Sequence, residues 1–348
     1  MIAWLRQRLF ATPVDAAVTL VCLYMVWRLS VPLVHWLLLD ATWSGSSRDD
    51  CTGAGACWVF VRVRFGQFMY GQYPLGERWR VDLVGALWLM VTLALSWRGL
   101  PRRAGATLAA VLLLPPVGIV VLHGGWGTGL RLVETREWGG LMLTLFLTLY
   151  AGLIAIPLGV LLALGRRSRL PLVRFASVVF IEFWRGVPII TVIFLASLLL
   201  PLIMPTGFDI DRLARAVIGL AFVIAAYMAE AVRGGLQALP EGQTEAAQAL
   251  GLGYWGIQRM IVLPQALRIA LPAMTNEVIS LFKSTTLVLI VSIFDLLGIA
   301  QAALADPAWV GMNMEAYVFA GAIYWFACFG LSQWSRTRER RLQLAHGR

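Results

Sequence analysis

The sequence predicts an all-α integral membrane protein with about eight transmembrane helices. Hydrophobic residues make up 59% of the chain, charged residues make up only 14%, and 15 of the 348 residues are tryptophan. Soluble domains carry about 25% charged residues, so this composition is typical of the membrane class. The apolar residues also gather in separate stretches of about 20 residues, the length at which a helix crosses about 30 Å of hydrocarbon.

These stretches follow one another along the whole chain, and we expect the longer ones to be tilted or broken. The first follows a basic start, as in a signal peptide, but it runs past ~20 residues and no small-residue cleavage site follows it. We therefore expect it to be retained as a span. The predicted spans are 16–39, 81–97, 106–122, 138–164, 175–204, 213–232, 276–304 and 316–334.

Arginines in the loops predict the orientation of these spans. Most loop arginines lie in segments that are cytoplasmic if the N-terminus is inside, which predicts that both termini and the loop around Glu245 face the cytoplasm. The arginines on that side are Arg6, Arg8, Arg98, Arg102, Arg103, Arg166, Arg167, Arg169, Arg174, Arg233, Arg259, Arg268, Arg336, Arg338, Arg340, Arg341 and Arg348.

The outside loop 40–80 is the exception, because it carries Arg48, Arg62, Arg64, Arg78 and Arg80. Its stretch FVRVRFGQFMYGQYPLGERWR is aromatic and basic, which predicts an interfacial helix along the outer membrane surface. In the first span, Arg28 carries a charge that costs about 2.5–3.5 kcal/mol at mid-membrane depth. We expect its guanidinium either to reach the interface or to pair inside the bundle.

Two of the four cysteines, Cys51 and Cys57, bracket the short stretch CTGAGAC in this outside loop. If the loop faces an oxidising compartment, we expect a small disulfide between them. Cys22 and Cys328 lie in apolar spans and are expected to fill space in the core. No histidine lies close to these cysteines in the sequence, so no metal site is predicted.

The longest polar interruption runs from Arg233 to Pro272 and contains two short helix signals. Thr244 is a suitable N-cap for the first helix, and Glu245 places a negative charge in its first turn. Gly251 is expected to stop this helix in the left-handed conformation. A second helix is predicted from Tyr254 to Leu263, ending at Pro264. So much local order predicts a docking surface rather than a simple connector.

This loop resembles the EAA loop of ABC-importer permeases at seven positions: Glu245, Ala246, Ala247, Gly251, Ile261, Leu263 and Pro264. The resemblance implies that the loop forms coupling helices, which bind in a groove of a separate ATP-hydrolysing subunit in the cytoplasm. The alternative is an ordinary cytoplasmic loop with two helices.

Residues 131–348, which follow the glycine-rich joint GGWGTGL, resemble the five-span permease core of the polar-amino-acid importer family over about 135–335. Residues 1–130 add three helices and an outer loop. With the stretch GACWVFVRVRFGQFMYGQYP, they look like the membrane subunits of the general L-amino-acid importers. The resemblance implies a bacterial inner-membrane protein.

Glu182, Arg185, Gly186 and Pro188 are similar to the family's E-x-x-R-G-x-P signature. Glu182 and Arg185 lie three residues apart on one helix face, and Pro188 is expected to bend the helix. The signature then forms either a structural kink with an ion pair or part of the gate. Glu230 and Arg233 brace the end of the sixth span, or they pass the motion of the loop into the bundle.

The segment TNEVISLFKSTTLVLIVSIFDLLG is similar to the family's K-x-T-S-L segment, which precedes an acidic position, here Asp295. An acidic group within a span is costly. By this resemblance Asp295 is the first candidate for a contact with the substrate ammonium, and Lys283 and Thr285 are further candidates for the pathway. The alternatives are a buried pair of Asp295 with Lys283, an outer-interface position for Asp295, and helix packing for Ser284, Thr285 and Thr286.

The sequence has no G-x-x-x-x-G-K-[ST] motif, no H-E-x-x-H, no Cys/His cluster and no G-x-S-x-G. We therefore predict no catalytic residues, no metal and no cofactor in this chain, with ATP and Mg²⁺ bound by the partner ATPase. The basic residues lie mostly between apolar stretches, so nucleic acid is not an expected partner.

The predicted function is the permease subunit of an ATP-driven amino-acid importer, without enzymatic activity of its own. The resemblance implies four partners: a nucleotide-binding ATPase subunit, a second and related permease chain, a periplasmic amino-acid-binding protein and the lipid bilayer. In this family the binding protein largely sets the specificity. The alternative function is an ion-driven secondary transporter, which would need intramembrane acidic pairs and inverted repeats. A membrane enzyme acting on lipid would need a nucleophile or metal cluster.

Overall fold

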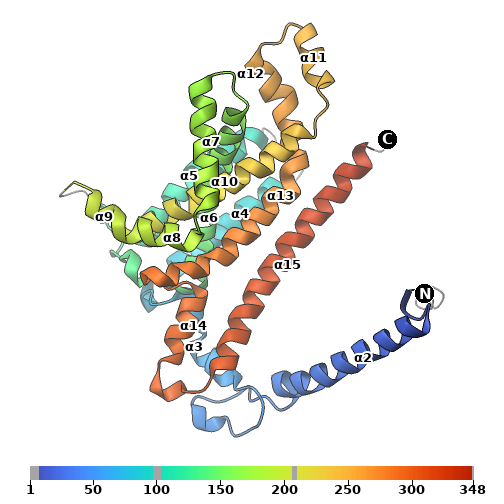
Figure 1. Ribbon diagram of the computed structural model, residues 1–348. Coiled ribbons are helices and arrows are strands. Elements are labelled where there is room, and N and C mark those ends of the chain that lie inside the picture. The colour runs from blue at the N-terminus through green and yellow to red at the C-terminus, as the bar shows by residue number, and fades with distance from the viewer. Residues whose placement is uncertain (1–7, 97–102, 206–209, 347–348) are drawn as a thin grey trace. The chain divides into compact units, whose positions relative to one another are not determined.

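The computed structural model describes residues 8–96, 103–205 and 210–346, and every regular element in these ranges is a helix (Figure 1). Six helical segments in the described ranges are long and apolar enough to cross a membrane, and a bent pair would raise the number to seven. The prediction of an all-α membrane protein is therefore confirmed. Arg6, Arg98, Arg102 and Arg348, on which part of the orientation argument rests, lie outside the described residues.

Most predicted spans correspond to helices that begin and end within a few residues of the expected bounds, whereas the last helix continues beyond the predicted end at 334 to His346. The predicted span 175–204 is the bent pair, Pro171–Gly186 (α7) with Ile189–Ile203 (α8 and α9), which changes direction by 103°. Span 81–97 corresponds to α4 (Arg78–Ser96), which is not among the candidate spans, and residue 97 lies outside the described residues. The others are α2 (Pro13–Val34, extended to Leu39), α5 (Arg103–His123), α6 (Gly140–Arg166), α10 (Arg212–Gln237) and α15 (Asn313–His346).

The predicted span 276–304 is wrong in its bounds. One helical segment runs from Tyr254 to Val291, and it includes α13 (Leu263–Ser284). The chain then turns at Ser292, which adopts the left-handed conformation with φ 57°, and α14 (Leu296–Leu304) begins. Asp295 starts this new helix, because its carboxylate accepts the Gly298 N–H at 2.9 Å as an N-cap does.

The chain divides into two compact units, Met1–Phe65 with Gln301–Phe319 and Gly66–Ala300 with Ala320–Arg348. The predicted boundary near residue 130 concerns the extent of the permease core and stays a prediction. The helix expected in the outer loop is present as α3 (Trp58–Tyr70). Its position along the membrane surface stays a prediction.

In the first unit, Cys51 and Cys57 form the expected disulfide. The adjacent chain is held to the distant segment 306–315 by polar contacts, since the buried carboxylate of Glu315 accepts the Cys57 N–H at 3.0 Å and Arg64 pairs with Asp306. Helix α2 contributes no buried side chain. Arg28 is exposed on it and forms no ion pair with any described residue, so the expected pairing inside the bundle is not present.

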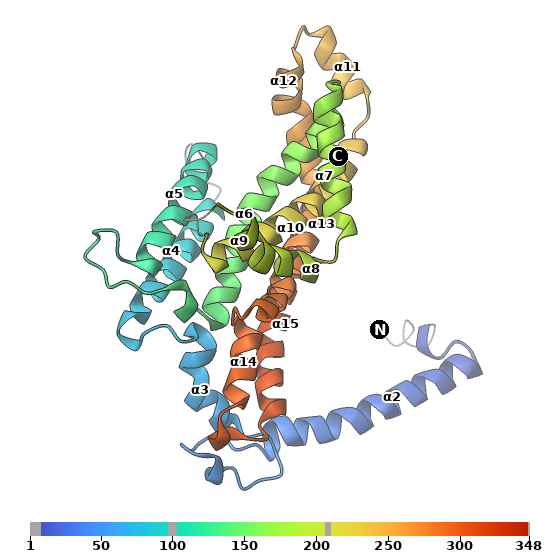
Figure 2. The same ribbon diagram turned by 60° about the vertical axis from the view of Figure 1, so that its left-hand side comes forward.

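In the second unit, α6, α10 and α13 pack side by side and form the core (Figure 2). Small residues permit this close approach. A Cβ atom on Gly159 of α6 would lie 2.5 Å from the Cβ of Met228 on α10, and one on Gly235 would collide with the carbonyl of Ala266 on α13. A residue larger than glycine at either position would therefore force the two helices apart.

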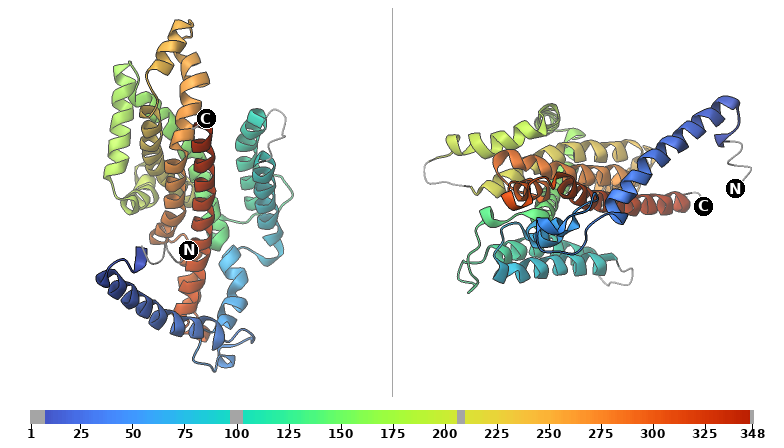
Figure 3. Two further views of the ribbon diagram at one scale, coloured as in Figure 1. Left: turned by 90° about the vertical axis from the view of Figure 1, so that its right-hand side faces the viewer. Right: turned by 90° about the horizontal axis from the view of Figure 1, so that it is seen from below.

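Helices α4 and α5 pack against each other (Figure 3), and they join the rest of the second unit through Val84 and Leu122, which belong to the hydrophobic core, and through polar contacts. Tyr73, just before α4, donates to the Leu122 carbonyl at 2.6 Å, and burial raises the pKa of this tyrosine to about 12, so it keeps its proton. The buried Arg80 pairs with Glu77 at 2.6 Å, and Tyr150 of α6 donates to the Pro115 carbonyl at 2.8 Å.

Candidate functional site

The segment that follows α10 forms a helical tip. Helix α11 (Gly242–Ala249) ends in a Schellman motif: Leu252 N–H bonds to the Ala247 carbonyl at 3.2 Å and Gly251 N–H to the Gln248 carbonyl at 2.9 Å. Gly251 has φ 77°, so the predicted left-handed stop is confirmed. Ala247 is buried in the core, whereas Glu245 and Ala246 are exposed.

Thr244 does not cap this helix, contrary to the prediction. Helix α11 begins one turn earlier, after Glu241, and Thr244 N–H bonds to the Glu241 carbonyl at 2.9 Å. The physical reason is that the Pro240–Glu241 turn already fixes the start of the helix, so the Thr244 hydroxyl is not needed there.

Pro264 does not end a helix either. Helix α12 (Tyr254–Ile257) continues through a π-helical turn (Gln258–Val262) directly into α13, and Leu263 N–H bonds to the Gln258 carbonyl five residues back. The wider π turn accommodates the proline, which has no N–H and would clash with a carbonyl in a regular helix. The polar interruption 233–272 is therefore shorter than predicted, because Arg233 still belongs to α10, and Pro264 and Pro272 to α13.

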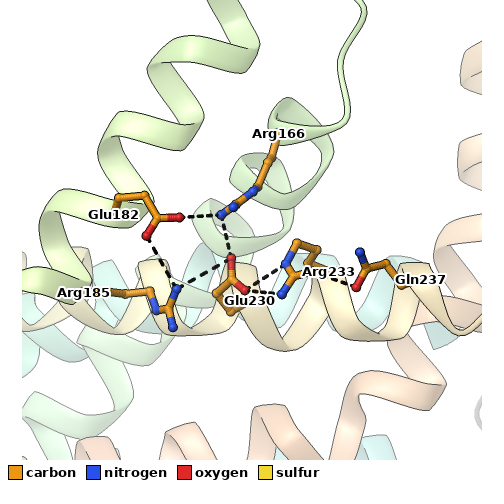
Figure 4. Close-up of polar contacts among 6 residues, drawn as sticks. All are labelled: Arg166, Glu182, Arg185, Glu230, Arg233 and Gln237. Carbon is orange, nitrogen blue, oxygen red and sulfur yellow. Dashed lines mark hydrogen bonds and ion pairs between the residues drawn. The ribbon is translucent and has the colours of Figure 1, made fainter.

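Glu230 of α10 lies at the centre of an ionic cluster just before this tip (Figure 4). Its carboxylate accepts from Arg166 at 2.8 Å and from Arg233 at 2.6 Å, and it lies 3.9 Å from Arg185. Glu182 joins the cluster through Arg166 at 3.0 Å and Arg185 at 4.0 Å. The side chain of Glu230 is only 17% exposed, so its charge depends on these partners.

This cluster connects three helix ends, since Arg166 ends α6, Glu182 and Arg185 lie in the last turn of α7, and Glu230 lies near the end of α10. The sequence reasoning paired Glu182 with Arg185 and Glu230 with Arg233. It missed Arg166, which bridges both carboxylates. A signal was present, because Arg166 also ends an apolar span next to a loop that the sequence predicts to be cytoplasmic.

The E-x-x-R-G-x-P signature marks a sharp break rather than a gentle bend. Helix α7 ends at Gly186, and Pro188 precedes α8 (Ile189–Phe194). A cavity of about 540 Å³ lies at this break, and its lining includes Arg185, Tyr227 and Glu277. The guanidinium of Arg185 lies 5.7 Å from the centre of the Tyr227 ring, so this arginine belongs to both the ionic cluster and the cavity wall.

Asp295 is fully buried and hydrogen-bonded. Besides capping α14, its carboxylate accepts from Tyr324 at 2.7 Å, and Thr285 lies at 3.5 Å. Lys283 is exposed and has no ion pair among the described residues, so the predicted pair with Asp295 is wrong. The long helix ends between these two residues, and the chain then places Asp295 against α15 and α6. There the Thr144 hydroxyl of α6 accepts the N–H of Leu296, the neighbour of Asp295, at 3.0 Å.

Together, several helices long and apolar enough to cross a membrane, a cavity lined by charged residues at a helix break and an exposed helical tip are typical of a membrane permease. Residues 155–343 match the family described as "Binding-protein-dependent transport system inner membrane component". This match covers more than half of the chain, and the chain belongs to this family. It is therefore a multi-pass protein of the inner membrane, and the family resemblance seen in the sequence is confirmed.

Relatives of known description support this assignment along nearly the whole chain. The chain is 49% identical to the "Inner membrane amino-acid ABC transporter permease protein YhdY" of Escherichia coli (strain K12), over 97% of this chain and 92% of that protein. It is 35% identical to the "Glutamate/glutamine/aspartate/asparagine transport system permease protein BztC" of Rhodobacter capsulatus, over 99% of this chain and 94% of that protein.

A solved structure also resembles more than half of this chain. The "Crystal structure of an amino acid ABC transporter with histidines" aligns with a TM-score of 0.52 and 32% sequence identity, and it covers 58% of this chain and 92% of that one. The two relatives of full length also include the region of α2 to α5, so these helices belong to the permease chain itself.

Proposed function

We propose that this chain forms half of the translocation pathway of an ATP-driven amino-acid importer, with a second, related permease chain as the other half. The printed names of the two full-length relatives support amino acids as the substrate class. The family description supports a separate binding protein that delivers the substrate from the periplasm. The ion-driven alternative has no support from either comparison.

The tip formed by α11 and α12 is proposed as the docking element for the ATPase subunit, which binds ATP and Mg²⁺. Its outermost apolar side chains, Leu250 and Trp255, are 81% and 74% exposed and have no cover in this chain. A pocket of about 610 Å³ separates the tip from the α6–α7 turn at Ser168. This combination of exposed apolar side chains and a rigid Schellman-capped helix suits a groove on a partner protein.

The observation that carries the proposal is the connection of this tip to the charged cavity. Helix α10 leads into the tip, and Glu230 near its end holds both Arg166 of α6 and Arg185 at the α7 break. A displacement of the tip by the ATPase would act on Glu230, and through Arg185 on the wall of the cavity. This is a physical route by which two global arrangements can be biased from the cytoplasmic side.

The cavity itself suits a zwitterion. Arg185 and Glu277 place a cation and an acid in one wall, which matches the carboxylate and ammonium of an amino acid. Asp295, Lys283 and Thr285 stay as candidates from the sequence, and a substrate contact with Asp295 would require its present hydrogen bonds to open.

Both termini are proposed to lie in the cytoplasm. The disulfide between Cys51 and Cys57 supports this orientation, because disulfides persist in the periplasm and are rare in the cytosol. The segment that carries it packs with residues 306–315, so both of these segments would face the periplasm.

The test is reconstitution of the chain in proteoliposomes with its ATPase, a second permease and the binding protein. We expect uptake of radiolabelled amino acid that requires ATP and is abolished when the binding protein is omitted. Uptake that persists without ATP and follows an imposed proton or sodium gradient would overturn the proposal.

A further inference from the structure

An apolar groove of about 600 Å³ lies between α4 and the core helices of the second unit. Its α4 wall is a stripe of residues three or four apart, Val81, Val84, Gly85, Trp88 and Thr92. The opposite wall on α6 reaches from Met142 to Ile156, which is about 21 Å along the helix axis at ~1.5 Å per residue. Side chains of α13 and α15 complete the lining.

The hydroxyl groups along this groove are already used. Thr92 donates to the Leu89 carbonyl, Thr148 to the Thr144 carbonyl and Tyr150 to the Pro115 carbonyl, each at 2.8 Å. A polar solute would therefore lose its water without gaining hydrogen bonds from these groups. The groove suits a hydrocarbon, and its length of about 21 Å compares with the ~30 Å of the bilayer core in which α6 and α15 lie.

Arg338 of α15 places a positive charge beyond one end of the groove. The last lining residue on α15 is Leu331, and Arg338 lies seven residues further, on the same face of the helix and about 10 Å beyond it. The guanidinium of Arg338 lies 5.5 Å from the centre of the Trp334 ring. A tryptophan beside an arginine is typical of the membrane–water interface, where lipid phosphates lie.

We propose that this groove binds a phospholipid, with an acyl chain along α4 and α6 and the phosphate at Arg338. The lipid fills the space between the α4–α5 pair and the core. Val84 of α4 and Leu122 of α5 already pack into the hydrophobic core, and the rest of the α4 stripe, with Trp88 and Thr92, lines the groove. The acyl chain supplies the apolar contact that the protein leaves open, because a void would lose dispersion contacts on both walls.

Two pairs of variants test the site by phospholipid retention. Gly85→Trp places a ring in the groove, because Gly85 lines it and a Cβ atom added there would meet no atom within 4 Å. Ala94→Trp adds the same ring nine residues on, about 180° around α4. Arg338→Gln removes the proposed phosphate partner, and Arg336→Gln removes an exposed arginine on another face of α15. Each chain is purified in mild detergent, washed, checked by elution volume and helix content, and assayed for bound phosphate and fatty acid.

We expect wild type, Ala94→Trp and Arg336→Gln to retain phospholipid, Gly85→Trp to lose it, and Arg338→Gln to release it at lower salt. Equal retention by Gly85→Trp and Ala94→Trp, or no phospholipid on the washed wild type, would overturn the proposal.

A second measurement needs no variant. Wild-type chain in nanodiscs of phosphatidylethanolamine and phosphatidylglycerol is irradiated with a phospholipid that carries a diazirine near the end of its acyl chain. The proposal expects adducts concentrated on α4 around Trp88 and on α13 around Phe282. Adducts spread evenly over exposed apolar residues such as Leu93 and Leu161 would contradict it.

Discussion

The carboxylate of Glu230 lies 2.8 Å from the guanidinium of Arg166, and this pair joins the end of α6 to α10 about two turns before α10 ends at Gln237. The same guanidinium also reaches Glu182 of α7 at 3.0 Å. Three helix ends are therefore held by one arginine and one mostly buried acid. If one of these helix ends moves, either the other two move with it or the ion pairs between them break.

Replacement of Glu230 by Gln removes the negative charge and leaves three arginines without their shared partner. Loss of one member of a buried ionic group costs roughly 3–5 kcal/mol. We expect uptake to fall at least ~tenfold, which corresponds to about 1.4 kcal/mol, while ATP hydrolysis by the reconstituted complex continues. Glu134→Gln, which breaks an exposed pair with Arg136, is the control and should leave uptake unchanged. Parallel loss of ATP hydrolysis and uptake in Glu230→Gln would argue against a coupling role.

Gly251 tests the tip itself. A Cβ atom added there would meet no atom within 4 Å, but at φ 77° a non-glycine residue costs about 1–2 kcal/mol. We expect Gly251→Leu to distort the α11 end, so that ATP hydrolysis is uncoupled from uptake while the chain stays in the membrane. Gly253→Leu is a matched control, because Gly253 also has open space around it but an ordinary φ of −71°. Normal uptake by Gly251→Leu would remove the coupling role of this motif.

The disulfide between Cys51 and Cys57 closes a short loop of six residues' separation. On the loop-entropy model such a cross-link contributes about 2 kcal/mol. In intact cells we expect a membrane-impermeant maleimide to label these cysteines only after mild reduction. Cys22 and Cys328, which lie in membrane helices, should stay unlabelled. Labelling without reduction would show that the bond is absent, and no labelling after reduction would contradict the proposed orientation.

Asp295 has two candidate roles, one in holding the start of α14 and one in contacting the substrate, and the substitution Asp295→Asn distinguishes them. Asn caps a helix as well as Asp does, so Asp295→Asn should preserve the start of α14. If the role of Asp295 is to hold this junction with Tyr324, the variant keeps the KM for uptake, whereas Asp295→Ala lowers the amount of folded chain. We expect this outcome from the buried geometry. A large increase in KM for Asp295→Asn at normal expression would instead support a contact with the substrate ammonium.

The sequence by itself determined the membrane class, most spans and the helix stop at Gly251, because each depends on local chemistry. Hydropathy marks a span, and the demand for a left-handed residue marks Gly251 as a helix stop. Only the tertiary structure decided which charges meet. Arg166, Glu182 and Glu230 lie on three helices, and their contact depends on the packing of α6 against α7 and α10. Likewise the place of Asp295 after the turn at Ser292 depends on its contact with Tyr324 of α15. Such contacts join residues far apart in the chain, and no periodicity in the sequence encodes them.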